Sequence, residues 1–268
     1  MSQPTNDQIR QNVRGRYQKI AVENISPASS CCSPATESCC DSPADFDAIS
    51  AKLGYSSIDL AAAPQGANLG LGCGNPQAIA ELQMREHVVD LGSGGGFDCF
   101  LASRQVGPQG HVIGVDMTPE MITRARNNAA KGQFANTEFR LGEIEHLPIA
   151  DDSVNVIISN CVINLSPDKQ QVFREAYRVL QPGGRLAISD IVTTAELPPE
   201  IKNNFDELYS GCISGASSIA DLESMLQESG FTHISIEPKD ESKSFIKDWI
   251  PGANVDQYIV SAVIKAKK

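Results

Sequence analysis

A glycine-rich segment is the part of the chain best suited to bind a nucleotide-like cofactor. The segment Asp90-Leu-Gly92-Ser-Gly94-Gly-Gly follows an apolar run, at a point where a strand should turn into a helix. Glycines at such a turn let backbone amides approach a ligand without a clash from Cβ. The dinucleotide fingerprint asks for glycine five positions after the first, but Phe97 stands there, which disfavours NAD.

Acidic residues around this segment favour S-adenosylmethionine. Asp90 would repel a pyrophosphate but suits the ammonium group of a methionine moiety. Asp116, which ends the next apolar run, can accept hydrogen bonds from both ribose hydroxyls. Farther along, Ile144 stands between Glu143 and Glu145, where an adenine could lie between an apolar side chain and polar edge contacts. The alternative is a generic glycine turn with incidental acids.

Three cysteines fall in loops that should meet near this cofactor site. Cys73 stands between two glycines, Cys161 directly follows a predicted strand, and Cys212 lies in a glycine-containing segment. Thiolates are soft ligands, so together they would bind a thiophilic element beside a methyl donor. Any single cysteine could instead be a buried packing residue, and Cys99, within a predicted amphipathic helix, is interpreted in that way.

The elements that must position these residues alternate along the chain. Strands are predicted near residues 87–91, 111–115, 137–141, 154–159, 185–191, 231–236 and 257–264. Helices are predicted near residues 5–20, 97–106, 119–131, 168–180, 198–209 and 219–229, with a turn at 182–184 and a short helix capped by Asn75. This alternation predicts an α/β, Rossmann-like fold with a mostly parallel sheet and ligands at the carboxyl ends of its strands.

Composition divides the chain into three parts. Residues 1–63 hold the first helix and an arm rich in Cys, Ser and Pro, and residues 64–195 form the cofactor-binding domain. Residues 196–268 form a small C-terminal part, which either completes the sheet or forms a lid.

Charge and cysteine content exclude several classes of partner. The net charge of −11 disfavours nucleic acid and acidic membranes, which need clustered Lys and Arg. No apolar run is long enough to span a membrane, and the N-terminus lacks a signal-peptide pattern. The 8 cysteines are therefore expected to be reduced thiols in a cytoplasmic protein.

Across roughly residues 66–195 the chain resembles the class I S-adenosylmethionine-dependent methyltransferases. The resemblance implies a seven-stranded sheet with helices on both faces. It also implies a set of cofactor contacts: Asp90, Gly92 and Gly94 near the methionine part, Asp116 on the ribose, Met117 and Ile144 beside the adenine, Glu143 or Glu145 (our candidate) at the adenine edge, and Asn160.

Within that superfamily the chain is similar to the arsenite methyltransferases over nearly everything after Gly54. The similarity is carried by Ile158-Ser-Asn-Cys161-Val-Ile-Asn-Leu, Gly72-Cys73-Gly-Asn-Pro, Tyr209-Ser-Gly-Cys212-Ile-Ser-Gly-Ala and Phe245-Ile-Lys-Asp-Trp-Ile-Pro-Gly. It implies Cys161 and Cys212 as arsenic ligands, with Cys73 as third ligand and disulfide partner of an arm cysteine. That cysteine is expected to be Cys40 or Cys39, while Cys31 and Cys32 stay open.

The resemblance thus predicts methyl transfer from S-adenosylmethionine to thiolate-bound As(III), a detoxification. Arsenite and methylarsenite are the expected substrates, glutathione or thioredoxin the expected reductant, and no metal cofactor is expected. One alternative is methylation of a small organic acceptor of the quinone or sterol type, with incidental thiols. A second is a non-catalytic binder that sequesters a metalloid through its cysteines.

Overall fold

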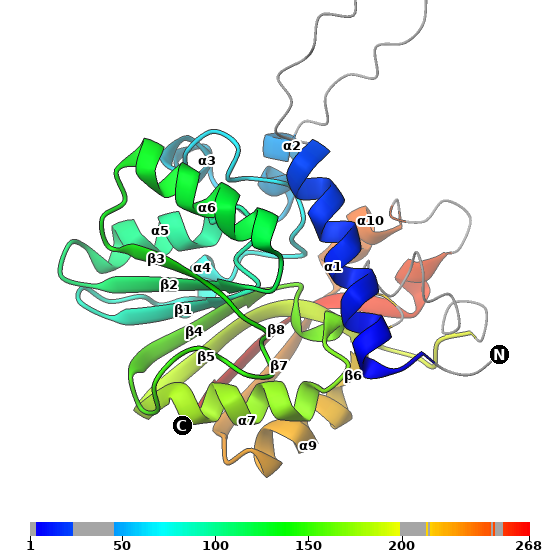
Figure 1. The fold of residues 1–268 in the computed structure, drawn as a ribbon. Coiled ribbons are helices and arrows are strands. Elements are labelled where there is room, and N and C mark those ends of the chain that lie inside the picture. Colours follow the sequence, from blue (N-terminus) through cyan, green and yellow to red (C-terminus); the bar gives the residue numbers. More distant parts are fainter. Residues whose placement is uncertain (1–3, 24–45, 199–212, 214, 248, 250–253) are drawn as a thin grey trace, which may run out of the picture.

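The computed structural model describes residues 4–23, 46–198, 213, 215–247, 249 and 254–268. One mixed sheet lies at its centre, in the order β3-β2-β1-β4-β5-β8-β7, with β6 pairing to β5 (Figure 1). Its strands are β1 (His87–Leu91), β2 (His111–Asp116), β3 (Thr137–Leu141), β4 (Val154–Asn160), β5 (Leu180–Thr193), β6 (Ser217–Ser218), β7 (Thr232–Lys239) and β8 (Ile259–Lys267).

The sheet joins a parallel part to an antiparallel part. Strands β1 to β5 pair in parallel, whereas β8 runs antiparallel to both β5 and β7. Because β8 lies between β5 and β7, the C-terminal part completes the sheet, which decides between the two possibilities left open by the sequence. Seven strands follow one another across the sheet and β6 is a short addition, so the predicted fold class is confirmed.

Helices cover both faces of the sheet (Figure 1). They are α1 (Asn6–Glu23), α2 (Phe46–Lys52), α3 (Ser57–Ala62), α4 (Gln77–Ala80), α5 (Phe97–Val106), α6 (Pro119–Gly132), α7 (Lys169–Val179), α9 (Ile219–Glu228) and α10 (Lys243–Ile246). Within the described ranges, no helix is both long and apolar enough to cross a bilayer.

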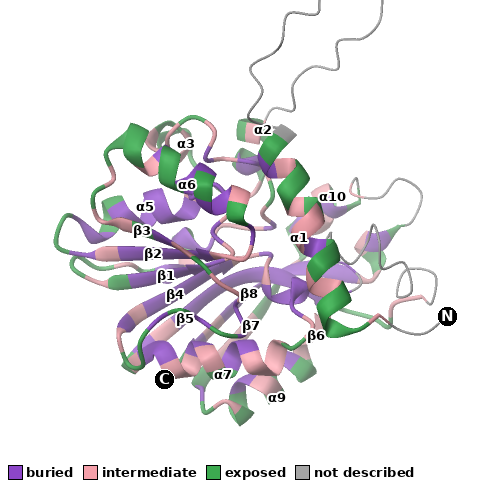
Figure 2. Cartoon of the chain, viewed as in Figure 1, coloured by how far each residue is buried: buried purple, intermediate pink, exposed green. Residues whose placement is uncertain are grey.

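Strand periodicity divides the core between the two faces. Val88 packs in a cluster with residues of α5 and α6, whereas its neighbour Val89 packs with residues of α7 and α9. This alternation follows from the period of two in an extended strand. Figure 2 shows the central strands as buried, which is why they read as continuous apolar runs in the sequence.

The element boundaries agree with the sequence predictions at most positions and differ at a few. Strand β5 begins at Leu180 and includes the predicted turn at 182–184, because Leu180 pairs with Val154 of β4. The Asn75 side chain accepts the backbone N–H of Ala78 at 3.2 Å, but the N-cap of α4 lies one residue later than predicted, at Pro76. The helix predicted for 198–209 lies outside the described residues except at its first position.

Candidate functional site

A cleft opens at the carboxyl ends of β1, β2 and β4, where the fold class places ligands. Its space amounts to about 1120 Å³ with the open mouth included. The lining contains the cofactor residues named from the sequence, with the exception of the alternative Glu143: Asp90, Gly92, Gly94, Asp116, Met117, Ile144, Glu145 and Asn160. Cys161 lines the same cleft.

The glycine loop between β1 and α5 forms the floor of this cleft. Gly92 and Gly94 have φ angles of 69° and 51°, in the left-handed region that favours glycine. A Cβ on Gly92 would lie 2.4 Å from the Val162 side chain, whereas a Cβ on Gly94 would meet nothing within 4 Å. The backbone at Gly92 therefore packs tightly against Val162, whereas the backbone at Gly94 faces the open space of the cleft.

Asp116 ends β2 beside the glycine loop. Its carboxylate accepts the backbone N–H of Gly94 at 3.0 Å and that of Thr118 at 2.8 Å. Burial raises the pKa of Asp116 although these two amides oppose the rise. The amides fix the carboxylate at the strand end, which suits hydrogen bonds from a ribose.

Buried acids gather at the other end of the cleft. Asp98 accepts a hydrogen bond from the Tyr55 hydroxyl at 2.8 Å, and Asp90 accepts one from the Cys99 thiol at 3.2 Å. Burial raises the pKa of Asp98 to about 6 and raises that of Asp90 well above its usual value, the latter also because of Asp98. Cys99 is fully buried in α5, so its predicted core position is confirmed, but its contact with Asp90 was not foreseen.

This donor set fits S-adenosylmethionine, which carries an ammonium and a sulfonium charge. The side-chain donors to Asp90 and Asp98 are neutral groups, namely the Cys99 thiol, the Tyr55 hydroxyl and the Asn160 amide. A cationic ligand would supply the missing compensation, because opposite charges attract strongly where water is excluded.

The two candidate glutamates for the adenine edge have different surroundings. Glu145 lines the cleft, accepts the Ser166 hydroxyl at 2.7 Å and lies 3.3 Å from Arg10 Nε. Glu143 is more exposed and lies outside the cleft lining, where it pairs with Arg14 at 3.2 Å and lies 3.6 Å from the same Arg10 Nε. Of the two, only Glu145 lines the cleft, and its contact with an adenine stays a prediction.

Helix α1 contributes a wall of the cleft that sequence reasoning missed. Arg10, Val13 and Tyr17 line the cleft, while Ala21 of the same helix packs against Met121 of α6. Nothing local in the α1 sequence indicates this role, because it depends on how the helix crosses the sheet.

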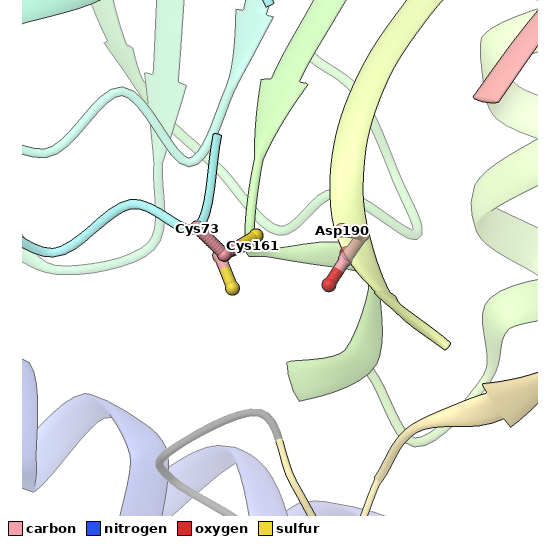
Figure 3. A group of neighbouring side chains, drawn as sticks. All are labelled: Cys73, Cys161 and Asp190. Atoms are coloured by element: carbon pink, nitrogen blue, oxygen red, sulfur yellow. The ribbon is translucent and has the colours of Figure 1, made fainter. Parts of the chain in front are cut away.

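Two cysteines and an aspartate form a second group of neighbouring side chains, here called the thiol cluster (Figure 3). Ligand atoms of Cys73, Cys161 and Asp190 all lie within 4.8 Å of one another, and the three residues are 1%, 5% and 2% exposed. The side chains come from three places: the loop before α4, the end of β4, and β5. Because only Cys161 also lines the cleft, it stands between the cleft and the rest of the cluster.

Hydrogen bonds from distant elements hold Cys73 in place. Its backbone N–H donates to Asn160 Oδ1 at 3.0 Å, and its carbonyl accepts the Ser261 hydroxyl at 2.8 Å. The Cys73 thiol points to the carbonyl of Ser189 at 3.6 Å. The Asn160 amide also donates to the Tyr55 hydroxyl at 3.1 Å, so it links the thiol cluster to the acids of the cofactor cleft.

Cys161 adopts a backbone conformation unusual for a residue with a side chain. Its φ is 61°, and such left-handed geometry costs about 1 kcal/mol outside glycine. The Cys161 N–H donates to the Ser189 carbonyl at 2.8 Å, which holds the residue in this turn. The turn places Cys161 directly after β4, where the residue lines the cleft.

Asp190 is the member of the cluster that sequence reasoning missed. Its Oδ1 accepts Asn164 Nδ2 and its own neighbour Ile191 N–H, both at 2.8 Å, and Oδ2 accepts the Asn164 N–H at 3.4 Å. Burial raises the pKa of Asp190 to about 6. The pattern Ile188-Ser-Asp190 offered a signal, since it places an acid in a strand beside the one that ends at Cys161.

Several predicted site residues fall outside the part of the chain that the structure describes. They are Cys212 and the arm cysteines Cys31, Cys32, Cys39 and Cys40. Their predicted roles as arsenic ligand and disulfide partner stay predictions.

Comparison with known proteins identifies related chains. A family model described as a methyltransferase domain matches residues 82–230. An arsenite methyltransferase of Halobacterium salinarum is 52% identical over 272 residues, covering 98% of this chain and 67% of that protein. An arsenite methyltransferase of Homo sapiens is 43% identical over 153 residues, covering 54% of this chain and 40% of that protein.

A solved structure shows the same similarity. The X-ray structure of CrArsM, an arsenic(III) S-adenosylmethionine methyltransferase from Chlamydomonas reinhardtii, is 33% identical with a TM-score of 0.62. The match covers 82% of this chain and 73% of that one. The chain thus spans about two thirds of the Halobacterium relative and less than half of the human one.

Proposed function

The chain belongs to the arsenite methyltransferase family, and on that premise we propose that it transfers methyl groups from S-adenosylmethionine to As(III) held by cysteine thiolates. The observation that carries the proposal is the position of Cys161. Its thiol lines the cofactor cleft and lies within 4.8 Å of ligand atoms of Cys73 and Asp190. The proposed substrates are arsenite and methylarsenite, and their methylation detoxifies arsenic.

The cleft residues hold and orient the cofactor in this proposal. Bound there, S-adenosylmethionine would supply an electrophilic methyl group on its sulfonium sulfur. Asp90 and Asp98 attract the cationic methionine end, because a bound cation offsets the cost that burial imposes on each ionised carboxylate. Asp116 accepts the ribose hydroxyls, while Ile144 and Glu145 contact the adenine.

The thiols bind the substrate and aim it. Each thiol gives up its proton as its sulfur replaces a hydroxide on arsenite, and water leaves. Sulfur suits As(III) better than oxygen or nitrogen because both atoms are soft. With Cys73 and Cys161 behind it, and Cys212 as the proposed third ligand, the arsenic lone pair faces the cleft. Near-attack positioning and exclusion of water then supply the rate advantage, without a general base.

A reductant closes the proposed cycle. Methylation uses the arsenic lone pair and raises arsenic formally from the trivalent to the pentavalent state. Two electrons return it to the trivalent state if two thiols become a disulfide, and the proposed pair is Cys73 with Cys40 or Cys39. Glutathione or thioredoxin would then reduce this disulfide, in a cytoplasm that keeps thiols reduced.

Separation of arsenic species tests the proposal. Reduced protein is incubated with arsenite, S-adenosylmethionine and glutathione, and the products are resolved by chromatography with element-specific detection. We expect methylated arsenic from the wild type and at least a hundredfold less from Cys161→Ser, because the substitution removes one of the thiolates that hold arsenic beside the methyl donor. The matched control is the rise in melting temperature with S-adenosylmethionine, which Cys161→Ser should retain.

The other outcomes separate the alternatives. A protein that binds the cofactor but forms no methylated arsenic would move the assignment to an organic acceptor. Tight arsenite binding with neither product nor a thermal shift by the cofactor would indicate a sequestering protein. Full activity in Cys161→Ser would overturn the thiol site itself.

A further inference from the structure

The thiol cluster contains a donor that arsenic chemistry does not need. As(III) prefers sulfur, yet the third ligand atom of the described cluster is a carboxylate oxygen of Asp190. From this juxtaposition we infer that Cys73, Cys161 and Asp190 also form a binding site for a thiophilic divalent cation, with Zn²⁺ as the best fit. The inference concerns the thiols of the proposed arsenic site but does not depend on methyl transfer.

The geometry suits a small tetrahedral ion. With zinc–sulfur bonds of about 2.3 Å, two sulfurs of a tetrahedral site lie about 3.8 Å apart. The observed limit of 4.8 Å between ligand atoms leaves a contraction of only about an ångström. Three protein ligands would leave the fourth position to solvent, the arrangement typical of zinc sites that stay accessible.

The charges of the site favour a divalent ion as well. When a cation binds, the two thiols give up their protons, so two thiolates and one carboxylate surround the ion in residues that are 1%, 5% and 2% exposed. Three anions this close repel one another where water is excluded, and a bound divalent cation offsets most of that cost. Zinc also accepts sulfur and oxygen ligands together, whereas a hard ion such as Mg²⁺ would reject the thiolates.

Asp190 is already oriented as a metal ligand would be. Its Oδ1 accepts two hydrogen bonds at 2.8 Å, whereas the Asn164 N–H lies farther from Oδ2, at 3.4 Å. Bonds to one carboxylate oxygen fix the group and leave the other oxygen able to coordinate. Asn164 and the Ile191 amide thus act as the supporting partners that metal ligands require.

The Asp190 carboxylate should also distinguish zinc from As(III). Zinc gains a strong third bond from Asp190, whereas As(III) held by thiolates gains little from a carboxylate. The conservative change Asp190→Asn should therefore weaken zinc binding much more than arsenite binding. It keeps the acceptor oxygen for Asn164, so the fold should survive.

Cobalt absorption provides a direct probe of this site. The full-length chain is prepared with serine in place of the five cysteines outside the described residues: Cys31, Cys32, Cys39, Cys40 and Cys212. Cys73, Cys99 and Cys161 then remain as its thiols. Reduced protein is titrated with Co²⁺, and the thiolate-to-cobalt absorption is followed, then displaced with Zn²⁺. We expect one Co²⁺ per chain, displaced by one Zn²⁺.

Variants in the same background test the ligand set. Cys161→Ser and Cys73→Ser should each abolish the band, and Asp190→Asn should weaken Co²⁺ and Zn²⁺ binding by roughly tenfold or more. Ser235→Ala, on the edge strand β7, is the control and should bind as the background does. Arsenite binding, read from fluorescence of the single tryptophan, Trp249, should change less than about threefold in Asp190→Asn.

The outcomes separate this inference from the proposed function. Absence of the cobalt band, or an unchanged affinity in Asp190→Asn, would overturn the cation site whatever the arsenic result. If Asp190→Asn fails to show the cofactor-induced thermal shift, the two cysteine variants decide, and a band retained in either would overturn the site. A cobalt site in a protein that does not methylate arsenic would leave the inference standing and remove the function.

Discussion

At the scale of single residues, the cleft contains buried carboxylates that lower the stability of the fold and favour binding of a cation. Asp90 and Asp98 are buried at 3% and 8% exposure, and burial raises the pKa of both. Such a site costs stability in the empty protein and recovers it when a cation binds. The sequence indicated Asp90 through its place before the glycines, whereas Asp98 and Tyr55 carried no motif.

Acid should weaken cofactor binding through Asp98. Its pKa is raised to about 6, first by burial and against the hydrogen bond from Tyr55; Asp90, Asp59 and Cys99 are further titratable groups near it. Only the ionised form attracts a cation, so the dissociation constant should rise as pH falls through 6, by at most about tenfold per pH unit for this group. Calorimetric titration with S-adenosylmethionine measures this.

The variant Asp98→Asn tests whether Asp98 causes this pH dependence of cofactor binding. It should bind the cofactor more weakly at pH 7 and lose most of the pH dependence. Because a raised carboxyl pKa costs stability above the folded-state value, the ligand-free variant should also melt higher than the wild type at pH 7. A wild-type dissociation constant that stays level down to about pH 5 would contradict the role of Asp98.

At the scale of elements, local sequence patterns predicted most of what supports the site. The strand before the glycine loop, the helix after it and the Pro119 start of α6 are all where expected, because each depends on neighbours in the chain. Thr118 precedes that helix but its side chain does not cap it. The early start of β5 could not be predicted, because it depends on pairing with β4.

A matched pair of glycine substitutions tests the loop. Gly94 and Gly183 both have positive φ, 51° and 82°, and neither would bring a Cβ within 4 Å of another group. Gly94→Ala and Gly183→Ala should therefore lose similar stability, about 1 kcal/mol each. Only Gly94→Ala should weaken S-adenosylmethionine binding, because its Cβ enters the cleft. Thermal unfolding with and without cofactor measures both effects. An equal rise in melting temperature with cofactor in the two variants would contradict the role of the Gly94 loop in cofactor binding.

At the scale of the whole molecule, the site is assembled from segments far apart in the chain. Cys73 precedes β1, Asp190 lies in β5, and α1 supplies Arg10 to the cleft. Neither Asp190 nor Arg10 could be assigned from the sequence, because their roles exist only once the sheet has formed. The C-terminal topology was likewise undetermined, since antiparallel pairing of β8 between β5 and β7 is a non-local choice.

The C-terminal strand should influence arsenic binding through Ser261. This residue of β8 donates its hydroxyl to the Cys73 carbonyl at 2.8 Å, across 188 positions of sequence. Ser261→Ala leaves that buried carbonyl without this bond, at a cost of about 1–3 kcal/mol. We expect arsenite affinity, read from Trp249 fluorescence, to fall several-fold while cofactor affinity stays within about twofold. Ser235→Ala on β7 is the control, and a fall of the same size there would remove the argument.

A single-turnover transfer of labelled methyl groups tests the central claim most directly. Reduced protein is loaded with one equivalent of arsenite, mixed with one equivalent of S-adenosylmethionine labelled on its methyl carbon, and quenched, and the label is located by chromatography. The account predicts label on arsenic in the wild type and label left on the cofactor in the doubly substituted Cys73→Ser, Cys161→Ser protein. Labelled arsenic formed at the same rate by that double variant would contradict it.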